Sequence, residues 1–155
     1  MPFGEGKRFN IIKPYGTINS MITRDKAITI SLFLLRFSAS LIFIQVGGLK
    51  LFGWFGGLPE GVPLSPLLVV AGILEFVGGA AILLGLFTRP VAFILSGEMA
   101  VAYFMGHASQ GHVFVPMLNQ GQPAVLLCFI FLFLAAYGAG EWSVDAMLRR
   151  RRQSA

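Results

Sequence analysis

Long apolar runs separated by short breaks dominate this chain after a mixed N-terminal stretch. Each run approaches the roughly 20 residues that a helix needs to cross a bilayer. The breaks are a Gly/Pro-rich loop after Phe52, a Thr-Arg-Pro turn and a polar loop rich in glycine and glutamine, all typical of connections between helices. The pattern therefore predicts four membrane-spanning helices over residues 27–52, 66–87, 88–106 and 123–140.

Helix-boundary residues support these limits. Ser65 is a favoured N-cap residue, and Pro66 fits the first turn of a helix, where its missing N–H costs nothing. Thr88 and Pro90 repeat this start signal at the third span, which at roughly 17 residues is near the short limit for crossing. We therefore expect Thr88 to cap the third helix as Ser65 caps the second.

The segment after the last span predicts a further short helix. The fourth span is expected to open at Pro123 and to end at Gly138 and Gly140. The sequence "WSVDAMLRRRR" that follows is typical of an interfacial helix, with Ser143 as its N-cap and Asp145 near the positive end of its own dipole. Three segments result: a polar basic N-terminal segment over residues 1–26, a four-helix membrane domain over 27–140, and an interfacial helix with a basic tail over 141–155.

Composition narrows the class of protein. Of the 155 residues, 55% are hydrophobic and 12% charged, and the mean hydropathy is +0.75. These values lie outside the range of soluble domains and predict an all-α integral membrane four-helix bundle. The first apolar run is too long for a signal-peptide core and is expected to be retained. The single cysteine, Cys128, excludes a thiol–disulfide relay within the chain.

The basic residues predict an orientation. They gather before the first span, in the turn between the second and third, and after the last, and an even number of spans places all these positions on one side. By the positive-inside rule that side is the cytoplasm, so both the N and C termini are expected there. The C-terminal cluster is expected to anchor this topology or to contact anionic lipid rather than to bind nucleic acid. The residues counted are Lys7, Arg8, Lys13, Arg24, Lys26, Arg89 and Arg149 to Arg152.

Three ionisable residues fall inside the predicted spans. Counted at 1.5 Å per residue from the cytoplasmic ends, Arg36 and Glu98 lie roughly 13 Å deep and Glu75 roughly 18 Å deep. Charged groups at such depths face the bundle interior and find partners, so we expect Arg36 between the two acids. One arginine cannot neutralise two carboxylates, and the second acid is expected to share it or to take up a proton. This cluster is the predicted catalytic centre; the alternative is a buried structural network that fixes helix packing.

Other polar residues surround this centre. Lys50 continues the polar face of the first span and either extends to the outer boundary or binds an anion. His107 is placed to pass protons at the outer mouth, and Asn119 is expected to line that entrance. Tyr103 either lines it too or simply packs. His107 and His112 match no standard ligand spacing, so no metal site is expected.

Small and polar residues also predict the helix contacts. Glycines on the second and third spans, among them Gly72, Gly78 and Gly97, are expected to form the seam where helices approach closely. On the first span, residues at helical spacing predict one shared inward face. These residues are Arg36, Ser40, Phe43, Gly47 and Lys50.

Four sequence blocks resemble, in order, those of the DoxX family over residues 32–146: "LRFSASLIFIQVGGLKLFG", "GILEFVGGAAILLGLFTRPVA", "GEMAVAYFMGHA" and "LNQGQPAVLLCFIFLFLAAYGAGEWSVD". The chain departs from the family pattern at Val46, where histidine is common, and at residues 119–122, where members carry Asn-Gly-Gly-Glu. These departures weaken any proton path to the outer side. The residues that match the family's motifs are Lys50, Glu75, Arg89, Glu98, His107 and Asn119.

The resemblance implies a multi-pass protein of the bacterial inner membrane. The family is named for its similarity to the small membrane subunit of a thiosulfate:quinone oxidoreductase, and some members occur in membrane oxidoreductase complexes. We therefore expect a subunit of a quinone-linked oxidoreductase system, in which the cluster of Arg36, Glu75 and Glu98 binds quinone or delivers protons. The expected cofactor-binding residues are Lys50, Tyr103, His107 and Asn119.

The expected partners follow from what the sequence lacks. It contains no haem, flavin or iron–sulfur ligand pattern, so electrons must come from a protein partner and the chain alone is not a complete oxidoreductase. The alternative is a non-catalytic accessory subunit that stabilises a larger respiratory or oxidative-stress complex. A transporter is disfavoured because no inverted repeat is detectable. Membrane lipids are the other expected partners, and self-association stays open.

Overall fold

The computed structural model describes residues 18–154, with side chains described from Thr23 onward. Every regular element in this range is helical, which confirms the predicted all-α class for residues 18–154. Lys7, Arg8 and Lys13, which were counted for the orientation, lie outside the described residues. The helices are α1 (Ile18–Phe52), η1 (Trp54–Gly56), α2 (Pro66–Ile73), η2 (Leu74–Gly78), α3 (Gly79–Leu84), α4 (Thr88–Ala102), η3 (Tyr103–His107), η4 (Ala108–Gln110), α5 (Gln122–Tyr137) and α6 (Val144–Gln153).

Three helical stretches are long and apolar enough to cross a membrane: Thr23–Phe52, Pro66–Leu84 and Thr88–Gln110. The third has 23 residues, longer than predicted, because the π-helical η3 and the 3-10 turn η4 continue α4 beyond Ala102. The predicted fourth span, α5, is apolar but has only 16 residues. The predicted membrane bundle is thus confirmed as far as three to four apolar helices, and its orientation stays a prediction.

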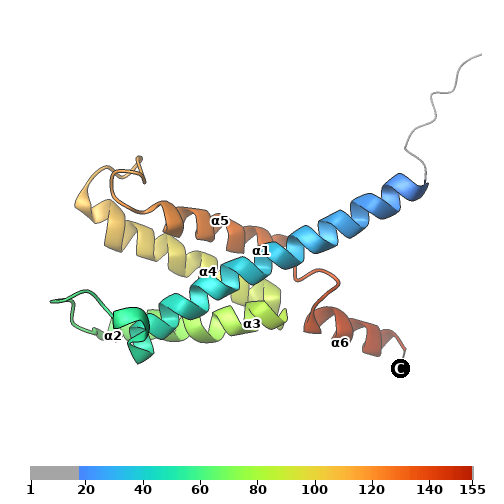
Figure 1. The fold of residues 1–155 in the computed structure, drawn as a ribbon, viewed down its shortest axis with the longest axis horizontal. Helices are drawn as coiled ribbons and strands as arrows, with labels where there is room; N and C mark the ends of the chain where they lie inside the picture. The colour runs from blue at the N-terminus through green and yellow to red at the C-terminus, as the bar shows by residue number, and fades with distance from the viewer. Residues whose placement is uncertain (1–17, 155) are drawn as a thin grey trace, which may run out of the picture.

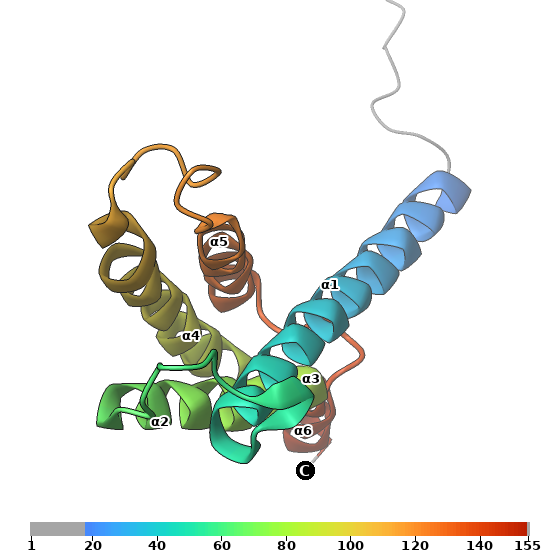
Figure 2. The same cartoon turned by 60° about the vertical axis from the view of Figure 1, so that its left-hand side comes forward.

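The helices form two groups: α1 packs with α2, η2 and α3, and α4 packs with α5. Figure 1 shows α4 and α5 lying antiparallel and side by side, with α1 crossing diagonally. Where α1 meets α5, the fully buried rings of Phe43 and Phe131 pack edge to face, with centroids 4.5 Å apart. Figure 2 shows α2 and α4 separating with distance from the turn that joins α3 to α4.

Glycines bring α1 and the second span into close contact, as predicted. A Cβ added at Gly47 would lie 2.6 Å from the backbone nitrogen of Phe76 and 2.8 Å from the backbone oxygen of Gly72. The two backbones can approach this closely at Gly47 only because this position carries no side chain. Gly78 instead makes room for a side chain, since a Cβ added there would lie 2.8 Å from Cδ2 of Leu95 in α4.

We expect Gly47→Ala to destabilise the protein by about 1–3 kcal/mol, because the new methyl group would push apart two backbones rather than a flexible side chain. Thermal unfolding in detergent measures the effect. Gly97→Ala is the matched control, since a Cβ there meets nothing within 4 Å and Gly97, contrary to expectation, is not part of the seam. Equal stability of the two variants would contradict the close contact at Gly47.

The start of α4 differs from the prediction. Ser65 caps α2 as expected, since its Oγ accepts a hydrogen bond from Leu68 N. Thr88, however, already lies inside α4, and the N-cap position is Phe87, which makes no side-chain cap. The free N–H groups of Phe87 and Thr88 donate instead to the carboxylate of Asp145 in α6, each at 2.9 Å. Asp145 lies in the first turn of α6, as predicted, and in addition caps the distant helix α4.

Candidate functional site

Glu75 is the most deeply buried acid among the described residues, with 2% of its surface exposed. Its Oε1 lies 2.5 Å from Nζ of Lys50, near the end of α1, and this is the only ion pair within residues 18–154. The close packing of α1 on the second span at Gly72 and Gly47 brings the two side chains together. Lys50 is thus paired with Glu75, a contact that the sequence did not predict for it.

Glu98 on α4 faces the same charged pair. Its carboxylate is within electrostatic range of both Glu75 and Lys50. Both of its oxygens are buried and accept no hydrogen bond from any residue of the described chain, and the same holds for Oε2 of Glu75. Buried polar oxygens without a partner are rare in folded proteins, so three of them at one place suggest a site for a proton or a ligand.

A cavity of about 560 Å³ lies between the second and third spans and contains these groups. Its size is within the range typical of small-molecule sites. Lys50, Glu75, Glu98 and His107 line it, and the rest of its wall is almost entirely apolar. Five apolar wall residues are 51–59% exposed, so the cavity opens sideways between the helices; these are Leu67, Val70, Ile94, Val101 and Met105.

Both helices that line the cavity contain a π-helical turn. Glu75 lies in η2, the π-helical stretch that joins α2 to α3, and His107 ends η3, the π-helical stretch that follows α4. A π turn inserts an extra residue and rotates the side chains that follow it, and such turns are frequent at functional sites. The sequence carried no signal for either turn.

His107 lies in the cavity wall, whereas Tyr103 and Asn119 support it from outside. His107 lines the cavity, and its Nδ1 lies 3.0 Å from the backbone oxygen of Asn119. A carbonyl only accepts, so Nδ1 carries the proton and Nε2 is the free ring nitrogen. Tyr103 and Asn119 lie outside the cavity wall: the hydroxyl of Tyr103 donates to Val113 O at 2.6 Å and accepts from Nδ2 of Asn119. They hold the loop between η4 and α5, whose Asn119 carbonyl contacts His107.

Arg36 corrects the predicted centre. It is buried, but it forms no ion pair with Glu75 or Glu98; its guanidinium donates to the backbone oxygens of Ala139 at 2.5 Å and Trp142 at 2.6 Å. These carbonyls belong to the connection between α5 and α6, outside both helices. Arg36 and Lys50 do share a face of α1, as predicted, but 14 positions separate them, roughly 21 Å along the helix.

The site can therefore hold a small polar group in an apolar slot. Lys50 and His107 supply nitrogen atoms, and Glu75 and Glu98 supply oxygens that can accept hydrogen bonds or protons. No three His, Cys, Asp or Glu side chains within the described part of the chain are arranged to hold a metal ion. The arrangement suits the binding of an apolar molecule with a polar head and the transfer of protons to it.

These features define a polytopic helical membrane protein with a largely apolar cavity between its spans, into which a few ionisable residues are built. The chain belongs to the DoxX family, whose model, described as DoxX, matches residues 31–108, half of the chain. The matched range includes Lys50, Glu75, Glu98 and His107. The resemblance found in the sequence is thus confirmed.

Curated relatives extend the similarity. A Haemophilus influenzae protein whose name assigns no function is 49% identical over 82 residues, covering 52% of this chain and 61% of that protein. Two Escherichia coli proteins are each 30% identical: inner membrane protein YqjF, over 75% of this chain and 90% of its own, and inner membrane protein YphA, over 74% and 87%. No solved structure matches.

Proposed function

We propose that this protein is the membrane subunit of a quinone-linked oxidoreductase system and that the cavity between the second and third spans binds the quinone. The observation that carries the proposal is the group of three unpaired carboxylate oxygens at the polar end of an otherwise apolar cavity. Quinone reduction needs two electrons and two protons, and a redox centre in a partner protein would supply the electrons. Arg36 is no longer part of the proposed site.

The residues present fit a quinone. Its carbonyl oxygens accept hydrogen bonds, and the ammonium group of Lys50 is the donor that lines the cavity. An isoprenoid tail needs an apolar path into the bilayer, and the half-exposed wall residues between the two spans provide one. A quinone dissolved in the membrane could thus enter sideways, without passing through water.

Glu98 and Glu75 would supply protons to the bound quinone. Glu75 is held by Lys50, whereas both oxygens of Glu98 are free, so Glu98 is the better proton donor to a bound head group. Glu75 would then return a proton to Glu98 or hold the ammonium group in place. Because Nδ1 of His107 is bonded to a backbone oxygen, only its Nε2 can exchange protons with the cavity.

The location and partner belong to the same proposal. The two Escherichia coli relatives are named inner membrane proteins, and the apolar spans of this chain support the same location for it. A protein partner that carries the redox centre would complete the reaction. The competing proposal is a structural accessory subunit, in which the cavity binds no quinone.

We expect Glu98→Leu to weaken quinone binding roughly tenfold or more, because it removes hydrogen bonds to an ionisable group without changing the side-chain size greatly. The measurement is cross-linking of a photoreactive ubiquinone analogue to the protein in lipid nanodiscs, with competition by unlabelled ubiquinone. Glu60→Leu, in the exposed loop before α2, is the matched control and should bind as the parent does.

Ala71→Phe tests the same cavity without changing its charge. Ala71 lines the cavity wall, so the larger side chain should fill the space and abolish labelling. Ile73→Phe is its control, since Ile73 lies on the exposed surface of the same helix and outside the wall. If both cavity variants label like their controls, the quinone proposal fails and the accessory-subunit proposal takes its place.

A further inference from the structure

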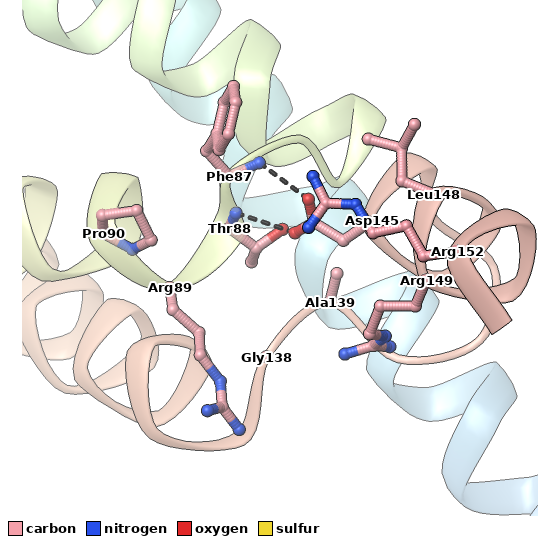
Figure 3. Close-up of a pocket in the computed structure, with 10 residues that line it drawn as sticks. All are labelled: Phe87, Thr88, Arg89, Pro90, Gly138, Ala139, Asp145, Leu148, Arg149 and Arg152. Carbon is pink, nitrogen blue, oxygen red and sulfur yellow. Dashed lines mark hydrogen bonds between the residues drawn. The ribbon is translucent and has the colours of Figure 1, made fainter.

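Three arginines line a second pocket, which shares no residue with the cavity that contains Glu75 and Glu98. This arginine pocket has a volume of about 290 Å³ and lies where the start of α4, the end of α5 and helix α6 meet. Figure 3 shows Arg89 and Arg149 flanking the chain at Gly138, with Arg152 beside Asp145. The three guanidinium groups thus come from two different helices.

Helix α6 is fixed in place, so the pocket is a built feature of the fold. The carboxylate of Asp145 accepts hydrogen bonds from Phe87 N and Thr88 N, and Asp145 N donates to Gly85 O at 2.9 Å. Figure 3 shows the first two of these bonds at the centre of the pocket. On α6, Arg149 and Arg152 lie four and seven positions after Asp145 and therefore share its face.

The pocket has an excess of positive charge. Asp145 is the only acid that lines it, and each of its oxygens is already occupied by a backbone N–H group. None of Arg89, Arg149 and Arg152 forms an ion pair with any residue in the described range. Three arginines held around one hollow without acidic partners are suited to a phosphate group, which guanidinium groups bind through paired hydrogen bonds.

Apolar side chains beside the arginines indicate the source of that phosphate. Phe87 and Leu148 belong to the pocket wall, yet they are 66% and 41% exposed. Phe93, one turn beyond Pro90 on α4, is 68% exposed. A free phosphate ion would gain nothing from these surfaces, whereas the acyl chains of a phospholipid would cover them.

We propose that the arginine pocket is a binding site for an anionic phospholipid, with the lipid phosphate between Arg89, Arg149 and Arg152 and the acyl chains along the exposed apolar surface of α4. The site is independent of the quinone cavity. Its ligand would stabilise the contact between α6 and the start of α4, because it would bridge arginines from both helices.

Helix α6 provides a control variant with the same change of charge. Arg149→Gln/Arg152→Gln removes two arginines from the pocket, and Arg150→Gln/Arg151→Gln removes two that do not line it. The probe is phosphatidylglycerol, with phosphatidylcholine as the zwitterionic reference, added to the full-length protein in detergent. Binding is read by native mass spectrometry and by the shift of the thermal unfolding temperature.

We expect the pocket variant to bind phosphatidylglycerol about tenfold or more weakly than the parent, because it loses two arginines at the proposed head-group site and each basic residue at an anionic lipid surface contributes roughly a fivefold factor. The control variant should bind within about threefold of the parent, because its two arginines do not line the pocket. Circular dichroism should show the same helix content in all three proteins. Arg89→Gln should add to the loss.

Three results would overturn the proposal. An equal loss in both double variants would mean that the tail attracts lipid only by its total charge. Competition by inorganic phosphate, at concentrations that leave the pocket variant's unfolding temperature unchanged, would mean that the pocket binds a free anion and not a lipid. Retention of phosphatidylcholine as strong as that of phosphatidylglycerol would likewise exclude selection for an anionic head group.

Discussion

Lys50→Met should destabilise the protein by about 3–5 kcal/mol, the range found when one partner of a buried ion pair is removed. The loss arises because Glu75, only 2% exposed, would keep its charge without a counter-ion or would have to bind a proton. Unfolding in detergent, followed by circular dichroism, measures the change. Lys26→Met, an exposed lysine of the same helix, should have little effect.

The double variant Lys50→Met/Glu75→Gln decides whether the pair itself is the cause. Removal of both charges leaves no isolated ion, so most of the lost stability should return. Quinone labelling should not return, because Lys50 is the proposed donor to the head group. If the double variant is as unstable as Lys50→Met alone, then packing of the lysine stem, and not its charge, is what matters at this position.

Arg36→Met should cost roughly 3–5 kcal/mol of stability, because two charge-assisted hydrogen bonds, each contributing about 1.5–3 kcal/mol, are lost together. The oxygens of Ala139 and Trp142 would remain without their donor. Quinone labelling of the folded fraction should be unchanged, since Arg36 does not line the cavity. Arg24→Met, at an exposed position of the same helix, serves as the control for both measurements.

Arg36→Lys separates geometry from charge. A lysine has one nitrogen where arginine has a planar fork, so it can reach only one of the two carbonyls well. Arg36→Lys should therefore lose about half as much stability as Arg36→Met. A loss of quinone labelling in Arg36→Met at full helix content would instead return Arg36 to the functional site.

The helices and their shared faces could be predicted because their causes are local. Ser65, Pro66 and Gly138 set helix ends through backbone chemistry that the sequence displays directly. The acids Glu75 and Glu98 were recognised because charge inside an apolar run is costly. The structure does place them on the same cavity.

The hydrogen-bond partners of Arg36 and Asp145 could not be predicted in the same way. The depth of Arg36 was counted from Ala27, but α1 begins at Ile18 and Arg36 lies level with the end of α5, so the count placed it too near the acids. Its actual partners are backbone oxygens, which every residue has and no sequence pattern marks. Asp145 was correctly assigned to the first turn of its own helix, but its contact with the start of α4 was missed, since only the tertiary fold brings the two together.

The hydrogen bonds of Arg36 and Asp145 have a consequence for the order of assembly. Both join early parts of the chain to its last segment: Arg36 binds residues more than 100 positions later, and the start of α4 is capped from α6. During synthesis, the first span must therefore enter the bilayer before its guanidinium group has a partner, and these bonds can form only once the residues after α5 have been synthesised.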